Sequence, residues 1–103
     1  MIARIWSARA TPENWPAYEN HFARNVLPEL RELDGYVSAK LLKREAGAEI
    51  EITVITFWDS WAAIDAFAGT DREAAVVAPN AAAVLIDYDR RVRHAEVVVS
   101  DAK

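Results

Sequence analysis

The residues of this chain best suited to acid–base chemistry are its two histidines, His21 and His94. An imidazole titrates near neutral pH and can take a proton from a weakly acidic substrate. His21 adjoins Phe22 on a predicted helix, where it is either a general base or a half-exposed helix residue. His94 shares a predicted strand face with Val92 and Glu96, so it either accepts a substrate proton or holds Glu96 or a backbone group. The sequence leaves both pairs of alternatives open.

Trp58 is the aromatic residue most favourably placed to contact a ligand. It ends the clearest predicted strand, directly before a helix start. There it forms either one wall of an aromatic pocket or part of the core, with its indole N–H paired. Trp6 on the first strand either lies in the sheet face at a contact between two chains, which is the favoured interpretation, or contacts a ligand.

Several kinds of site are excluded by residue type and motif. The chain has no cysteine, which excludes disulfides and thiolate metal ligands. His94 and Glu96 are only two ligands, fewer than the three of a catalytic zinc. The sequence also lacks a glycine-rich phosphate loop and a dinucleotide fingerprint. We therefore expect no cofactor and no metal.

Composition predicts one globular domain over residues 1–103, with 52% hydrophobic and 27% charged residues. The net charge of −4 disfavours nucleic acid, which binds mainly cationic surfaces. The start resembles no signal peptide, and no apolar run reaches the length of a membrane span. We expect a cytoplasmic protein that binds neither membranes nor nucleic acid.

The pattern in the first half predicts a strand, a helix and a hairpin. Residues 2–9 form the strand, and Thr11-Pro12 begins a helix whose apolar stripe runs to Leu33. Pro28 should kink or break this helix near Asn25. Alternating residues predict strands over 36–45 and 49–58, joined at 46–48.

The second half predicts two helices and two strands. Asp59-Ser60 caps the first helix, which ends at Gly69. Thr70 and Glu73 form a capping box that opens a short helix running to Ala78 and stopping at Pro79. Strands follow over about 83–89 and 91–99.

This order predicts an α+β fold with a ferredoxin-like antiparallel sheet and both helices on one face. The other sheet face also carries apolar residues, and the chain has nothing left to cover it. A second copy is the simplest cover, so we expect a homodimer through the sheet faces.

Several segments together resemble the antibiotic biosynthesis monooxygenase (ABM) family of dimeric α+β barrels. They are Ile-Ala-Arg-Ile-Trp at the start, Leu27-Pro28-Glu-Leu, Asp34-Gly35-Tyr36, Leu41-Leu42-Lys-Arg, Phe57-Trp58-Asp-Ser, residues 63–71 and the ending Val92-Arg-His94-Ala-Glu96-Val97. The similarity covers nearly the whole chain and is specific for the fold.

The resemblance implies two oxygen chemistries. One family activity cleaves haem, and its Asn, Trp and His would fall on Ser7, Phe67 and Val77, none of them retained. The other oxidises anthrones to quinones through the substrate's own carbanion, without metal or flavin. Its Asn, Trp, Tyr and Arg would fall on Val54, Trp58, Ile64 and Ala78, of which only Trp58 is retained.

The resulting hypothesis is a cofactor-independent monooxygenase-like protein acting on a small apolar or aromatic compound of the phenol, quinol or anthrone type. His94 or His21 would be the catalytic base, and Ser7, Trp58 and Phe67 would bind the substrate. The alternative is a non-catalytic small-molecule-binding or lactone-isomerase-like dimeric α+β barrel.

Overall fold

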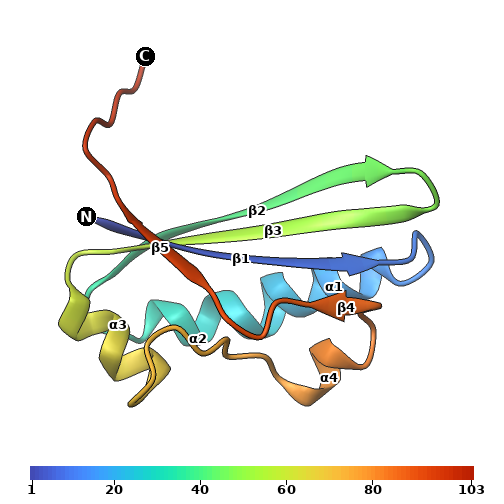
Figure 1. Ribbon diagram of the computed structural model, residues 1–103, viewed down its shortest axis with the longest axis horizontal. Helices are drawn as coiled ribbons and strands as arrows, with labels where there is room; N and C mark the ends of the chain where they lie inside the picture. Colours follow the sequence, from blue (N-terminus) through green and yellow to red (C-terminus); the bar gives the residue numbers. More distant parts are fainter.

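A computed structural model describes residues 1–103 as one antiparallel sheet with every helix on the same side (Figure 1). The sheet order is β2-β3-β1-β4, and β5 also pairs with β1. Its strands are β1 (Ile2–Ala10), β2 (Tyr36–Ala46), β3 (Glu49–Trp58), β4 (Asp87–Tyr88) and β5 (Arg93–Glu96). The expected α+β class and ferredoxin-like arrangement are confirmed.

The two central strands, β1 and β3, place alternate residues on opposite faces of the sheet. Trp6 of β1 lies opposite Val54, and Ala8 opposite Ile52, so most of the buried residues of both strands share the face that the helices cover. The opposite face carries the partly exposed pair Ile5 and Ile55. The alternation therefore fixes which side chains point into the layer between sheet and helices.

The long helical segment covering the sheet is interrupted, as Pro28 predicts. It comprises α1 (Trp15–His21), a π-helical segment η1 (Phe22–Val26) and α2 (Leu27–Arg31). In η1 the Leu27 N–H bonds the Phe22 carbonyl five residues earlier. The expected break near Asn25 is confirmed, and it takes the form of a π-bulge, a feature common at functional sites.

The start of this helix lies later than the sequence predicts. Thr11 caps only a turn, because its hydroxyl accepts from the Asn14 N–H at 3.1 Å. The helix itself begins at Trp15, with Pro16 rather than Pro12 in its first turn. Pro16 fits there because the first helical N–H groups have no intrahelical partner.

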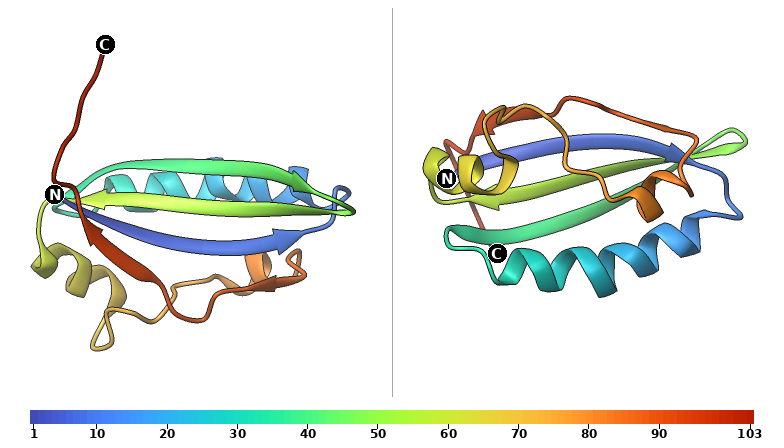
Figure 2. Two further views of the ribbon diagram at one scale, coloured as in Figure 1. Left: turned by 45° about the horizontal axis from the view of Figure 1, so that its top comes forward. Right: turned by 90° about the horizontal axis from the view of Figure 1, so that it is seen from below.

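Helix α3 (Trp61–Ala68) follows the predicted caps. The Ser60 hydroxyl accepts from the Ala63 N–H at 3.1 Å. Gly69 ends the helix with a φ of 87°. Helix α3 follows β3 closely and lies on the same side of the sheet as α1 and α2 (Figure 2). Its Phe67 packs against Trp58 of β3, with ring centroids 5.2 Å apart.

The structure has no helix over residues 70–78, so this prediction is wrong. Backbone groups of this segment bond the distant C-terminal part instead: Ala75 N–H donates to Arg90 at 2.9 Å, and Val92 N–H donates to Glu73 at 2.7 Å. These long-range bonds replace the helical ones that the capping box would begin. Pro79 then opens the short helix α4 (Pro79–Ala82) rather than ending one.

The last two strands are shorter than predicted. Residues 83–85 continue the turns of α4, since Val84 N–H bonds Ala81 and Leu85 N–H bonds Ala82. Strand β4 pairs with residues 8–9 of β1, whereas β5 pairs with residues 2–5. Both short strands therefore share one edge of β1.

The core lies between the sheet and the helical layer in two adjoining groups. Ile52 belongs to the group under α1, whereas Trp58 and Ile64 belong to the group beside α3. All three side chains are fully buried. No helix is both long and apolar enough to cross a membrane.

Candidate ligand-binding cavity

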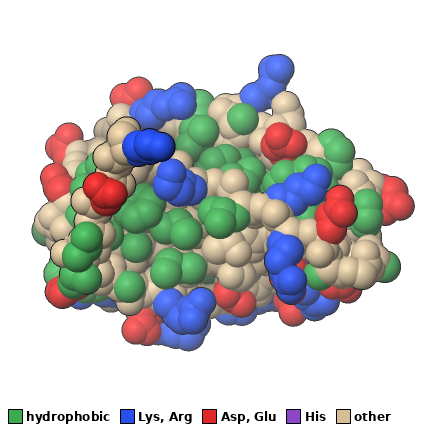
Figure 3. Space-filling view, turned by 90° about the horizontal axis from the view of Figure 1, so that it is seen from above, with side chains coloured by type: hydrophobic (Ala, Val, Ile, Leu, Met, Phe, Trp, Pro, Cys, Tyr) green, Lys and Arg blue, Asp and Glu red, His purple; other side chains and the backbone are tan.

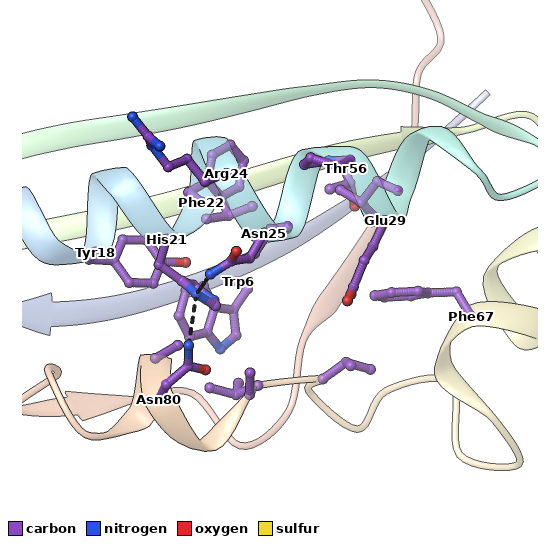
Figure 4. Close-up of a pocket in the computed structure, with 18 of the residues that line it drawn as sticks. Trp6, Tyr18, His21, Phe22, Arg24, Asn25, Glu29, Thr56, Phe67 and Asn80 are labelled. Atoms are coloured by element: carbon purple, nitrogen blue, oxygen red, sulfur yellow. Dashed lines mark hydrogen bonds between the residues drawn. The ribbon is translucent and has the colours of Figure 1, made fainter.

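A cavity of about 650 Å³ lies between the inner sheet face and the helical layer (Figure 4). Strands β1 and β3 supply its floor, α1 to α2 form one wall, and residues 76–81 form another. Of its 20 lining residues, 12 are hydrophobic. A volume of this size with an apolar lining and few polar groups is typical of a small-molecule site.

Aromatic side chains form much of the apolar lining. Trp6, Tyr18, Phe22 and Phe67 all line the cavity. The Trp6 and Tyr18 rings lie 6.1 Å apart between centroids, and Phe67 comes from α3 at the opposite end of the view (Figure 4). The lining therefore suits a flat, apolar ligand.

Three polar side chains meet where α1, η1 and α4 approach one another (Figure 4). His21 Nδ1 lies 3.0 Å from Asn25 Nδ2 and 3.4 Å from Asn80 Nδ2. With the amides donating to Nδ1, the imidazole carries its proton on Nε2 and is a donor. Turning both amides by 180° places their oxygens against Nδ1–H and leaves Nε2 free to accept a proton. The amide orientation therefore decides whether His21 is a donor or a base.

Tyr18 adds a hydroxyl to this end of the cavity. Its side chain is buried, and burial raises the pKa of the phenol well above its ordinary value. This hydroxyl forms no hydrogen bond within the protein. Every side-chain nitrogen or oxygen that is fully shielded from solvent does have a hydrogen-bond partner, so the hydroxyl is not fully shielded. The hydroxyl is thus open to the cavity as a neutral donor.

Arg4 is the charged residue on the cavity floor. It lies on β1 between Thr56 of β3 and His94 of β5, and only 5% of its surface is exposed. Its guanidinium lies 5.5 Å from the Phe67 ring centroid. Desolvation lowers the pKa of Arg4, although a guanidinium remains charged at neutral pH.

Two of the five predicted site residues, His21 and Phe67, line the cavity. Trp58 is not among the lining residues: it is completely buried and packs against Phe67, with ring centroids 5.2 Å apart. Its indole N–H donates to the Thr56 hydroxyl at 2.8 Å. Of the two alternatives for Trp58, the geometry corresponds to the core residue with a paired N–H.

The other two predicted residues, Ser7 and His94, also lie outside the cavity lining. Ser7 pairs with Thr53 on the opposite sheet face. His94 packs edge-on against Trp61, and its Nε2 lies 3.1 Å from Arg4 Nη1. Because a guanidinium only donates, His94 accepts here through Nε2. Burial and the nearby Arg4 charge lower the pKa of His94, which favours this neutral form.

Sequence reasoning missed Arg4, Tyr18, Asn25 and Asn80. Arg4 shares its strand face with the apolar Ile2 and Trp6, so its inward direction was readable from alternation. The spacing of four between His21 and Asn25 is likewise a signal on a helix. Nothing in the sequence brings Asn80 to His21, since 59 residues separate them.

The sheet, its helical layer and the half-open, mostly hydrophobic cavity between them define a small α+β domain with a candidate small-molecule site. The family model for antibiotic biosynthesis monooxygenases matches residues 1–78, and the chain belongs to that family. No curated protein matches the sequence.

Solved structures share the fold along nearly the whole chain. The heme-degrader MhuD from Mycobacterium tuberculosis, with two hemes bound, matches at a TM-score of 0.67 and 23% identity over 99% of this chain and all of its own. A Nitrosomonas europaea protein of unknown function matches at a TM-score of 0.65 and 17% identity, over 99% of this chain and 93% of its own. A Streptomyces coelicolor monooxygenase from the gene ActVA-Orf6, in complex with nanaomycin D, matches at a TM-score of 0.59 and 14% identity, over 99% of this chain and 89% of its own.

The positions that the family resemblance assigns to haem cleavage do not form a haem site. Phe67 and Val77 line the cavity but cannot ligate iron, and Ser7 faces away from it. Nor does any group of three or more histidine and carboxylate side chains converge as metal ligands. Among the anthrone-oxidising positions, Val54 and Ala78 line the cavity, whereas Trp58 and Ile64 are buried beside it.

Proposed function

We propose that this protein is a cofactor-independent monooxygenase for a small aromatic compound of the phenol, quinol or anthrone type. The observation that carries the proposal is the apolar cavity of about 650 Å³ with a polar cluster at one end. Its aromatic lining excludes water from a flat ligand and leaves the polar groups to orient it. The family membership of the chain supports the same reaction class.

The proposed reaction needs a substrate that becomes an anion easily. Removing a proton from the activated methylene of an anthrone gives a stabilised carbanion, which supplies electrons to oxygen. The methylene becomes a carbonyl with one oxygen atom, and its two hydrogens leave with the other as water. The protein's part is to bind the ring, accept the first proton and stabilise the developing negative charge.

His21 is the proposed base, because it is the one histidine in the cavity lining. It takes the proton at Nε2 in the orientation where the Asn25 and Asn80 oxygens face Nδ1–H. The Tyr18 hydroxyl, held neutral by its raised pKa, donates to the substrate oxygen. His94 is occupied with Arg4 and acts on the substrate only through that residue.

Oxygen uptake with 1,8-dihydroxyanthrone tests the proposal after the rate without enzyme is subtracted. His21→Gln should lower the enzymatic rate about 10²–10⁴-fold, the usual contribution of a general base. Ser7→Ala is the control, because Ser7 lies on the opposite sheet face, and it should retain the wild-type rate. Uptake that is equal in wild type and His21→Gln would remove His21 as the base. Binding without any enzymatic uptake would favour the non-catalytic alternative.

We also propose that the protein works as a homodimer through its outer sheet face. Figure 3 looks onto this face and shows hydrophobic side chains gathered at its centre. Ile5, Ile55 and Phe57 are partly exposed there, and Leu42 is 44% exposed. Light scattering should give twice the chain mass, and Ile55→Lys should give the mass of one chain. A wild-type monomer at micromolar concentration would contradict the proposal.

A further inference from the structure

Arg4 is a buried cation without a carboxylate partner. Every arginine–carboxylate pair in the structure involves another arginine, and Arg4 appears in none of them. Burying a charge is costly unless it is paired or fully hydrogen-bonded. This unbalanced positive charge lies on the floor of a mostly hydrophobic cavity, whose other charged lining residues are Arg24 and Glu29.

The protein uses only part of the hydrogen-bonding capacity of Arg4. Nη1 donates to the Arg72 carbonyl and to His94 Nε2, and Nη2 donates to the Ala74 carbonyl at 2.7 Å. A guanidinium carries five N–H groups, so Nε–H and the second Nη2–H make no bond to the protein. Every side-chain nitrogen that is fully shielded from solvent has a hydrogen-bond partner. Nε has none, so it is accessible.

In any arginine, Nε–H and one of the two Nη2–H groups lie along the same edge of the guanidinium. With the Ala74 carbonyl bonded to the other Nη2–H, both donors of this edge are free. Such an edge binds the two oxygens of one carboxylate with parallel hydrogen bonds. The three occupied bonds and the Phe67 ring 5.5 Å away hold the guanidinium in place. Arg4 is therefore preorganised for an anion, and binding one would not require it to give up its protein contacts.

We propose that Arg4 binds the carboxylate of the ligand, and that the natural ligand of the cavity is therefore an aromatic acid. The proposal rests on the proposed function in using the same cavity, and it adds the charge of the ligand. The ring would lie against the aromatic lining, with its carboxylate at Arg4. The polar cluster of His21, Asn25 and Asn80 then faces a different part of the ligand (Figure 4).

A nearby carboxylate and a second role of Arg4 itself bear on this proposal. Glu29 also lines the cavity and points toward the Phe67 side (Figure 4), but it forms no ion pair with Arg4 in the structure. The other role of Arg4 is to tie residues 72–74 to the sheet through their carbonyls. A purely structural role predicts no difference between an anionic and a neutral ligand of equal shape.

Calorimetric titration with 2-naphthoate and with its neutral counterpart 2-naphthamide separates these roles. Wild type should bind naphthoate about 10–100-fold more tightly, as expected for charge-assisted hydrogen bonds. Arg4→Met should abolish this preference while leaving naphthamide affinity within about twofold. Arg4→Lys keeps the positive charge but loses the paired donors. The logarithm of its affinity ratio, naphthoate over naphthamide, should be less than half that of wild type. Arg31→Met removes an exposed cation outside the cavity and should keep the full preference.

Each outcome either supports the proposal or overturns it. Equal affinity of wild type for both compounds overturns it, and so does a preference that survives in folded Arg4→Met. If Arg4→Met fails to fold, the wild-type preference and its decrease in Arg4→Lys decide the matter. Equal binding together with oxygen uptake from neutral 1,8-dihydroxyanthrone would leave the proposed function intact without the anion site. Naphthoate preference without oxygen uptake would retain the anion site alone, and failure to bind either compound would overturn both.

Discussion

Gly35 lies where the α2–β2 connection packs closely against the start of α3. Its φ is +84°, and an added Cβ would lie 2.4 Å from the Ala63 Cβ and 2.6 Å from the Asp59 Oδ1. Its carbonyl also accepts from the Asp59 N–H at 2.9 Å, so the backbone cannot move away freely. Gly47 at the β2–β3 turn has a φ of +64° but has open space where its Cβ would be. The pair separates backbone strain from steric collision.

Both Gly35→Ala and Gly47→Ala place a Cβ on a left-handed backbone, which costs about 1–2 kcal/mol. Only Gly35→Ala adds the collision, which costs about 1–3 kcal/mol in a packed region. We expect Gly35→Ala to lower the free energy of unfolding by about 2–5 kcal/mol in all. At about 4–8 °C per kcal/mol for a domain of this size, its Tm should fall at least about 4 °C below that of Gly47→Ala.

Urea denaturation followed by far-UV circular dichroism measures both variants against wild type. Equal losses in the two variants would refute the reasoning, because the contact with Ala63 would then carry no cost. A larger loss in Gly47→Ala would refute it more strongly. A Gly35→Ala chain that does not fold agrees with the expectation only if Gly47→Ala still folds.

Further predictions concern the cavity and the pH dependence of stability. Phe67→Ala should weaken 2-naphthamide binding about tenfold or more in calorimetry, because Phe67 lines the cavity. Trp58→Phe should leave that affinity within about twofold. It should lower the free energy of unfolding in urea by about 1–3 kcal/mol, because the Thr56 hydroxyl loses its donor. A loss of affinity instead would place Trp58 at the ligand. Ala81→Phe should fill cavity space and abolish naphthamide binding while the variant stays folded by circular dichroism, and unchanged affinity would show that the ligand binds elsewhere. The pKa of His94 is lowered from its ordinary 6.5, so the unfolded chain binds this proton first and stability should fall as pH drops below about 6.5. His94→Gln should flatten this part of a plot of Tm against pH, and an unchanged slope would exclude His94 as its source.

The strands and the first helix were predictable because their signals are local and agree with their surroundings. Alternation in residues 49–58 predicted that strand with the bounds it has in the structure, and Pro28 indicated the irregular helix. The capping box at Thr70 failed because a local signal competed with long-range backbone bonds such as Ala75 to Arg90. Arg4 adds bonds to the carbonyls of the same segment.

The candidate site was only partly predictable for a related reason. His21 and Phe67 stand out by residue type, and both line the cavity. Trp58 stands out equally, but it is completely buried against Phe67 and does not line the cavity, which no spacing reveals. The direction of Arg4 was readable from strand alternation, whereas its missing carboxylate partner appears only once the ion pairs of the folded chain are known.

The most direct test of ligand binding between sheet and helices is a heteronuclear NMR titration with 1,8-dihydroxyanthrone. The perturbed amides should belong to lining residues such as Val26, Val77 and Ala81. The amides of Leu42 and Ile55, whose side chains lie on the opposite sheet face, should change little. Perturbations confined to Leu42, Ile55 and their neighbours, or none at saturating ligand, would contradict the proposed site.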